Sequence, residues 1–298
     1  MDRNACLCRA MNPRGRCRPC SYDTLLGVGA VSPRPAAKLA QPTAPATTTT
    51  HPMPLQELFC YMLVQPSGGE LELARGARGL RAGIFNEACD GRRVYSSARV
   101  LVAGGEYTEA VVDASGAPLN MHCDFSPDGH RALNARVFYD FWRHLLRDGG
   151  EIFGYRWSAK VDADTVFLPQ LLRPGLAARD AARAEYVDYC PSDGGYGHGP
   201  VEVVSRAGLR RLGASGRAGG LGGCQKLLGR DPTNREDWLM RRCLEKNGVK
   251  SIKLSVISED TCPPTVRPGF ECGAGKAAFH PYKDVESWRA CWSAVVAR

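Results

Sequence analysis

Residues 157–169, WSAKVDADTVFLP, decide the fold of this chain of 298 residues. Apolar side chains alternate along 157–161, which predicts a buried strand, and Asp162 and Asp164 follow directly. Acids at i and i+2 share one face if the strand continues, and a turn would bring them closer together. Ligands of open α/β sheets bind at the carboxyl ends of the strands. The stretch therefore predicts a strand of an α/β sheet that ends at a ligand crevice.

Two carboxylates at this spacing can reach one cation, and their hard oxygen ligands suit Mg²⁺ or Mn²⁺. The alternative is a solvated strand end, where Asp serves as a turn former. The pattern D-x-D on its own leaves both interpretations open.

Three further segments bear on whether Asp162 and Asp164 form a metal site or a solvated strand end. The glycines of 194–205 (GGYGHGPVEVVS) allow a backbone to approach a ligand closely, or they form an ordinary loop. Glu236 and Asp237 open a predicted helix, where acids complement the helix dipole or where one Asp accepts a proton. His280, in AAFHPY, is a structural histidine or an imidazole ligand added to the carboxylates.

Hydrophobic periodicity predicts strands alternating with helices, and hence a doubly wound α/β layer structure. Strands are expected at 58–64, 84–85, 92–96, 99–102, 155–161, 186–187, 201–204 and 251–257, and helices at 69–81, 132–147, 208–212, 235–247 and 284–296, with another beginning at 168–172. The glycine-rich stretch 213–223 is expected to be a loop.

Composition divides the chain into three parts. Residues 1–30 are a Cys- and Arg-rich tail that we expect to be disordered, 31–54 a Pro/Thr-rich linker, and 55–298 a single domain. The net charge of +8 is largely a property of the first 50 residues, which carry seven Lys and Arg against two Asp. We therefore expect no nucleic-acid partner.

The longest apolar run, 58–64, has seven residues, so no transmembrane segment is expected. No apolar signal-peptide core is visible near the start. The 13 cysteines favour an oxidising compartment. Four of them (Cys6, Cys8, Cys17 and Cys20) lie in the tail, either as zinc ligands or unstructured. Sequence proximity suggests the disulfides Cys224–Cys243 and Cys262–Cys272.

Four segments in this order, KVDADTVF, GHGPVEVVS, REDWLMRRCL and AAFHPYK, resemble a GT-A glycosyltransferase. The resemblance is to the fringe-like, beta-galactosyltransferase-type family, in an uncharacterised protist branch, and it extends over residues 55–292. It implies a GT-A-like doubly wound mixed sheet with helices on both faces.

The resemblance also implies roles for individual residues. Asp162 and Asp164 would flank the Mn²⁺ or Mg²⁺ that grips the donor diphosphate, with Asp164 the more direct ligand and His280 a further one. Asp237 would be the general base, with Glu236 beside it. Gly197, His198 and Gly199 would line the donor sugar, and residues 64–66 and 89–95 would hold the nucleoside.

The implied activity is metal-dependent transfer of a hexose from a nucleotide-sugar, most simply a UDP-sugar, to a hydroxyl of a glycan or glycoprotein acceptor, with inversion. The implied location is the Golgi or secretory-pathway lumen. An alternative is a catalytically weak nucleotide-sugar-binding or lectin-like module on the same fold. Arg235 favours that alternative, because a bulky cation stands where relatives carry a small residue.

Overall fold

The computed structural model describes residues 56–126, 132–147, 149–188, 200–214, 220–230, 235–254, 256–257, 272–273 and 275–297. The predicted tail and linker lie outside these residues.

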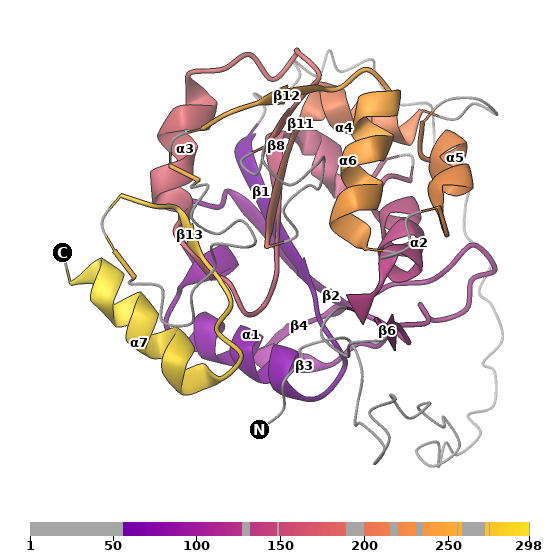
Figure 1. Ribbon diagram of the computed structural model, residues 1–298. Helices are drawn as coiled ribbons and strands as arrows, with labels where there is room; N and C mark the ends of the chain where they lie inside the picture. Colours follow the sequence, from indigo (N-terminus) through magenta and orange to yellow (C-terminus); the bar gives the residue numbers. More distant parts are fainter. Residues whose placement is uncertain are drawn as a thin grey trace, which may run out of the picture.

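A seven-stranded sheet runs through the middle of the domain (Figure 1). Its strands, in spatial order, are β12 (Lys250–Ile252), β10 (Glu185–Val187), β11 (Val201–Ser205), β8 (Tyr155–Val161), β1 (Gln56–Leu63), β2 (Gly91–Ser96) and β5 (Glu109–Ala110). Neighbours are parallel except at β11, which is antiparallel to both β8 and β10. The sheet is therefore mixed, as predicted.

Three two-stranded ladders accompany the main sheet. They are β3 (Leu101–Ala103) with β4 (Glu106–Tyr107), β6 (Asp124–Phe125) with β7 (Ala132–Leu133), and β9 (Val166–Phe167) with β13 (Ala278–Phe279). The last ladder matters for the candidate site, because it joins the chain just after β8 to the C-terminal segment.

Helices cover both faces of the main sheet (Figure 1). The α-helices are α1 (Gly69–Gly79), α2 (Ala135–Leu145), α3 (Pro169–Ala177), α4 (Arg206–Gly213), α5 (Gly220–Cys224), α6 (Glu236–Lys246) and α7 (Val285–Val296), and the 3₁₀ helices are η1 (Gly83–Phe85), η2 (Glu151–Gly154) and η3 (Gln225–Leu227). One apolar core lies under α1, α3 and α7, and a second under α2, α4, α5 and α6. The prediction of a doubly wound α/β sheet is confirmed.

The side chains of strand β8 alternate between the two faces of the sheet. Trp157, Ala159 and Val161 join the core under α1, α3 and α7. The residues between them face the other way, and the Lys160 ammonium lies over the ring of Phe138 on α2. A lysine is thus buried in the middle of the domain.

Two expected elements differ near the start of the domain. Residues 84–85 were expected to be a strand but belong to η1, because the chain leaves α1 through Arg81 and Gly83 at positive φ. The helix expected over 132–147 is shorter: it spans Ala135–Leu145, since residues 132–133 pair with β6 instead.

Two more corrections concern the second half of the chain. The stretch 213–223, which was expected to be a loop, includes most of α5. There, the hydrogen bond from Gly220 N to Asn247 Oδ1 and the disulfide Cys224–Cys243 outweigh the poor helix propensity of glycine. The strand expected over 251–257 ends at Ile252, because the chain turns at Leu254, whose carbonyl accepts from Ile257 N at 3.1 Å.

Three disulfides lie within the described residues: Cys60–Cys89, Cys224–Cys243 and Cys272–Cys291. The predicted Cys224–Cys243 pair is confirmed. The predicted Cys262–Cys272 pair is wrong, because Cys272 is bonded to Cys291 on α7. Chain folding, not sequence proximity, selects this partner.

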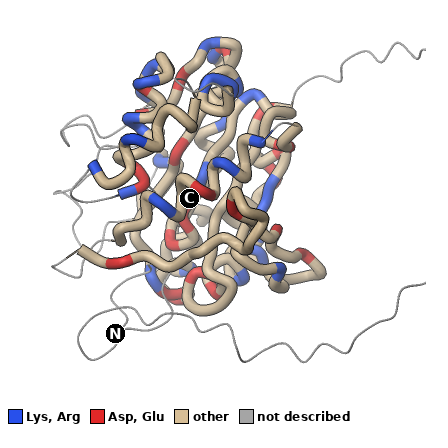
Figure 2. The backbone as a smooth tube through the Cα atoms, turned by 90° about the vertical axis from the view of Figure 1, so that its right-hand side faces the viewer, with Lys and Arg blue, Asp and Glu red and all other residues tan. Residues whose placement is uncertain are grey.

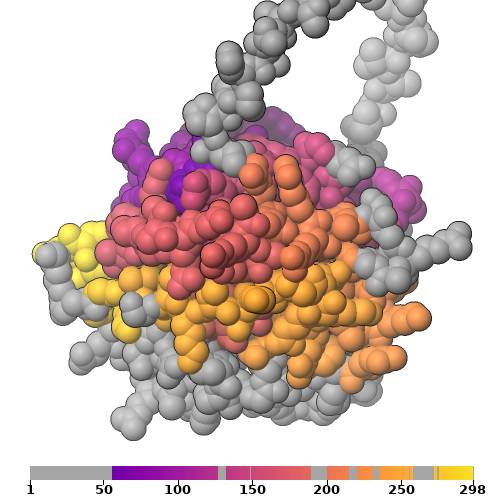
Figure 3. All heavy atoms as spheres, turned by 90° about the horizontal axis from the view of Figure 1, so that it is seen from above, coloured from indigo at the N-terminus to yellow at the C-terminus, as the bar shows by residue number. Residues whose placement is uncertain are grey.

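The surface carries both signs of charge. Segments of Lys and Arg and segments of Asp and Glu are interspersed along the tube of Figure 2. Seen from above in Figure 3, the segments around β10 and β12 lie side by side although some 60 residues separate them, as their parallel pairing requires. No described helix is long and apolar enough to cross a membrane.

Trp288 on α7 anchors the chain that follows β8. It is 2% exposed, and its Nε1 donates to the Thr165 carbonyl at 3.1 Å. We expect Trp288→Phe to lower the free energy of unfolding by about 1–3 kcal/mol, because a buried carbonyl loses its donor. Thermal or urea denaturation measures this loss. Trp292→Phe, which changes the ring stacked on Trp288, is the matched control; equal losses in both variants would count against an anchoring role for this hydrogen bond.

Candidate metal centre and neighbouring carboxylates

The strand β8 ends in a tight turn that carries the two acids. Asp162 N donates to the Pro200 carbonyl at 3.0 Å, next to β11, and Thr165 N donates to the Asp162 carbonyl at 3.0 Å. The backbone therefore bends at 162–165 instead of continuing the strand. Both acids lie at the carboxyl end of the central strand, where the sequence predicted a crevice.

The C-terminal segment returns to this turn and brings His280 with it. Val166 and Phe167 pair antiparallel with Phe279 and Ala278. The ladder is extended at one end by Leu168 N donating to the Ala277 carbonyl, and at the other by Tyr282 N donating to the Asp164 carbonyl, both at 2.8 Å. His280 is placed opposite Asp164 by backbone hydrogen bonds on both sides of it.

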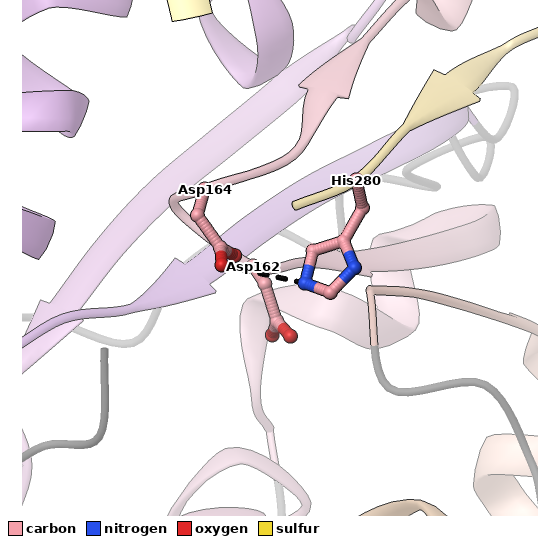
Figure 4. A group of neighbouring side chains, drawn as sticks. All are labelled: Asp162, Asp164 and His280. Atoms are coloured by element: carbon pink, nitrogen blue, oxygen red, sulfur yellow. Dashed lines mark ion pairs between the residues drawn. The ribbon is translucent and has the colours of Figure 1, made fainter. Parts of the chain in front are cut away.

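Asp162, Asp164 and His280 form a cluster (Figure 4). One ligand atom from each lies within 4.8 Å of the others, and His280 Nε2 is 3.3 Å from Asp164 Oδ2. Ligands bonded to one Mg²⁺ or Mn²⁺ at about 2.1 Å lie at most about 4.2 Å apart, so side-chain shifts of a few tenths of an ångström suffice. The donor set, two carboxylates and an imidazole, fits a divalent cation of this kind.

Asp164 is held as an anion by two basic side chains. The carboxylate forms ion pairs with His280 and with Lys283. Burial opposes its ionisation, but His280 first and then Lys283 outweigh burial and hold the pKa of Asp164 well below its usual range. The ammonium of Lys283 contacts the same Oδ2 as His280, so a cation bound there would share that oxygen or displace an existing partner.

Asp162 has a different environment two residues away. Its Oδ1 is 2.9 Å from the ammonium of Lys160. Burial raises the pKa of Asp162, and Lys160 opposes that rise only in part. Lys160 also pairs with Glu236, the first residue of α6. Both acids belong to the cluster, but Asp164 is paired with His280 and Lys283, whereas Asp162 is linked through Lys160 to the helix that begins with Glu236 and Asp237.

Asp237 lies in the first turn of α6. Its Oδ1 accepts from Trp238 N at 2.7 Å and is 3.8 Å from Nε of Arg235. Burial, and then the charge of Glu236, raise the pKa of Asp237 to about 7, while Arg235 acts in the opposite direction. A carboxyl group with such a pKa can exchange a proton near neutral pH.

A pocket opens beside the cluster. It is lined by polar and ionisable groups from both halves of the domain (Glu70, Asn134, Asp162, Asp164, His280 and Lys283), with Leu63, Ala132, Phe138 and Ala163 between them. Burial raises the pKa of Glu70 to about 8, although its carboxylate accepts from Gln65 N at 3.0 Å. A concave site with several perturbed carboxyls is a candidate ligand site on physical grounds.

The other predicted site residues lie in different places: some are outside the described residues, some are next to the pocket, and some are at the far end of their strand. Gly197, His198 and Gly199 lie outside the described residues. Residue 64 follows β1 and lies next to the pocket-lining Leu63, whereas Cys89 lies just before β2, at the amino end of that strand. Of residues 89–95, Tyr95 pairs with Leu63 and so comes closest to the pocket along the sheet.

Sequence patterns missed four of the charged residues around the site. Lys160 carried a signal, since a lysine interrupts a strand that is otherwise buried, and Lys283 follows His280 by three residues. Nothing in the sequence pattern singled out Glu70 or Glu202. Glu202 on β11 becomes a neighbour of Lys160 only through the antiparallel pairing of β8 and β11.

Comparison with known proteins adds little. No protein-family profile matches the chain, and no curated protein matches it. Among solved structures, the crystal structure of the galactosyltransferase LgtC in complex with donor and acceptor sugar analogues is similar over 80% of this chain and 96% of that chain, with 12% identity and a TM-score of 0.41. At that TM-score the likeness carries no inference, and the proposals below depend on the residues of this chain.

Burial of Asp237 predicts a pH-dependent effect on stability. Its folded-state pKa of about 7 lies above the usual value, so its contribution to stability is present in full below the ordinary aspartate pKa and is lost as pH rises from there to about 7. We expect Asp237→Asn to raise the melting temperature at pH 8 and to change it little at pH 4.5. Calorimetry at the two pH values measures the difference. Asp180→Asn, at an exposed carboxylate, is the control; a gain for Asp237→Asn that is no larger at pH 8 would contradict the assignment.

Proposed function

We propose that this protein is a metal-dependent GT-A-type glycosyltransferase. It would move a hexose from a UDP-sugar to a hydroxyl of a glycan or glycoprotein, with inversion at the anomeric carbon. The observation that carries the proposal is the Asp162, Asp164 and His280 cluster at the carboxyl end of β8, with a separate, partly buried carboxyl, Asp237, on the neighbouring helix α6.

The cluster would serve the donor. Asp162, Asp164 and His280 would hold the cation, which when bound supplies Lewis-acid stabilisation to the leaving diphosphate. Lys283 carries positive charge beside the same pocket and is suited to pair with a donor phosphate oxygen. Glu70, in the same pocket, accepts from the backbone just after β1 and so helps to shape the wall of the donor site.

Asp237 would serve the acceptor. Inversion requires attack on the face opposite the leaving group, and a base within hydrogen-bond reach of the attacking hydroxyl. Asp237 is separate from the metal cluster in sequence and lies on a different element, as the two roles require. Glu236 lies beside it but is paired with Lys160, so Glu236 is the less suitable proton acceptor.

The first test is a panel of nucleotide-sugars with Mn²⁺, read as release of nucleoside diphosphate. We expect release from at least one donor. We also expect Asp164→Asn to abolish Mn²⁺-dependent donor binding, because the cluster then loses one of its two carboxylates. Calorimetry measures this binding. Asp180→Asn is again the matched control. Donor binding by Asp164→Asn at wild-type strength would contradict the metal assignment.

A second prediction concerns pH. If Asp237 is the base, kcat/KM rises as pH increases through about 7, where the carboxylate forms. Because Arg235 lowers the pKa of Asp237, Arg235→Met is expected to move this rise to higher pH, and Asp237→Asn to lower kcat by about 10²–10⁴-fold while donor binding persists. A pH–rate profile of the three proteins provides the measurement. An unchanged profile in Arg235→Met would exclude Asp237 as the titrating group.

One observation favours the alternative of a nucleotide-sugar-binding module with weak activity. Arg235 lies 3.8 Å from Asp237 and is mostly buried, so an acceptor must compete with it for the carboxylate. The donor panel separates the two functions: donor binding without turnover in the wild type, and turnover gained in Arg235→Gly, would identify the module.

The proposed location is the Golgi or secretory-pathway lumen. Three disulfides in the described part of the chain support an oxidising compartment.

A further inference from the structure

Lys160 is an unusual residue to find inside a domain. It is 1% exposed and lies on β8, two residues before Asp162. Its cross-strand neighbours are Tyr61 on β1 and Glu202 on β11, and its ammonium is 4.5 Å from the centre of the Phe138 ring. A buried ammonium is unfavourable unless it is paired, and an apolar side chain would fill the same space at no such cost.

The ammonium joins two segments that are 76 residues apart. It is 2.9 Å from Asp162 Oδ1 on one side, and it pairs with the carboxylate of Glu236 on the other. Glu236 is itself 7% exposed and is the first residue of α6. A single side chain therefore connects an acid of the metal cluster to the start of the helix that carries Asp237.

A second contact fixes the same helix end. Glu236 N donates to Asn134 Oδ1 at 3.2 Å, and Asn134 is the N-cap of α2 and lines the pocket. This hydrogen bond restrains the backbone of α6, whereas Lys160 restrains its first side chain. The two contacts act on one residue from two directions, so the start of α6 has a defined position relative to Asp162.

Glu202 adds negative charge to the same buried site. It is 8% exposed, and its Oε2 has no hydrogen-bond partner among the described residues. With Asp162 and Glu236, it gives Lys160 three carboxyl neighbours. Without the ammonium, Asp162 and Glu236 would lie close together with no cation between them, and their like charges would drive them apart.

We propose that Lys160 is a positioning residue that couples the two halves of the site. It holds Asp162 in place for the cation and Glu236 in place for α6, and so sets where Asp237 stands relative to the bound donor. This inference rests on the proposed function, but its first half, the hold on Asp162, is measurable from metal binding alone.

The test compares Lys160→Met, Glu236→Gln and Lys250→Met with the wild type. Methionine retains most of the apolar stem of lysine and removes the charge. Lys250 is an exposed lysine on β12 and provides the matched control. Two quantities are measured: the affinity for Mn²⁺ without donor, from the electron paramagnetic resonance signal of free Mn²⁺, and kcat and KM for transfer with the donor identified by the panel.

We expect Lys160→Met to weaken Mn²⁺ binding and to lower kcat, each by about 10–100-fold, the range typical for loss of a group that orients a metal ligand. Glu236→Gln releases only α6, so kcat is expected to fall by about tenfold while Mn²⁺ affinity stays within about threefold of the wild type. Lys250→Met is expected to match the wild type in both quantities. If Lys160 had a purely structural role, the two variants would not differ in this way, with Mn²⁺ affinity lowered in Lys160→Met but retained in Glu236→Gln.

The outcomes separate the inference from the function on which it rests. A folded Lys160→Met protein with wild-type Mn²⁺ affinity would overturn the inference alone. If Lys160→Met does not fold, Glu236→Gln decides: wild-type kcat in that variant would overturn the coupling. A wild type that binds no Mn²⁺ would overturn the proposed function and the inference together.

Discussion

The hydrogen bonds between residues 164–168 and 277–282 are the constraint on which the candidate site depends. Asp162 and Asp164 are two residues apart in the sequence, but His280 and Lys283 come from more than a hundred residues further on. Backbone bonds from Leu168 to Ala277 and from Tyr282 to Asp164 bring them together, with the β9–β13 pairs in between. The buried Trp288 and the disulfide Cys272–Cys291 then tie α7 to the same region. The candidate metal cluster thus depends on how the C-terminal segment packs, and not on the D-x-D pattern alone.

Periodicity predicted the elements that bury a continuous face. Strand β8 and helices α2, α6 and α7 were recognisable because their apolar residues recur at the spacing of their element. The acids at the end of β8 followed from the same reasoning. Short elements were missed, because two residues, as in β9 or β13, carry no period, and α5 was missed because glycine has a poor helix propensity that contacts with Asn247 override.

Contacts between distant segments were beyond sequence reasoning for a physical reason. The pair Lys160–Glu236 depends on which way β8 alternates and on how α6 packs over the sheet, and neither is encoded within a local window. The fringe-like resemblance named Glu236 and Asp237 together, yet the structure gives them different environments. Glu236 is paired with Lys160, while Asp237 lies partly buried beside Arg235 with a pKa raised to about 7. The pKa of Asp237 suits it to exchange a proton near neutral pH.

The two acids of the D-x-D pattern are distinguished by the same principle. Asp164 faces His280 and Lys283, which hold its pKa well below the usual range, so it is an anion at every physiological pH. Asp162 faces Lys160 and lies closer to Glu236, and burial raises its pKa. Its charge is thus the one that a bound cation would stabilise most. A metal ion at this site would therefore depend on Asp164 for initial attraction and on Asp162 for linkage to α6. Under the proposed function, donor binding would then be joined to the position of Asp237 through a single buried lysine.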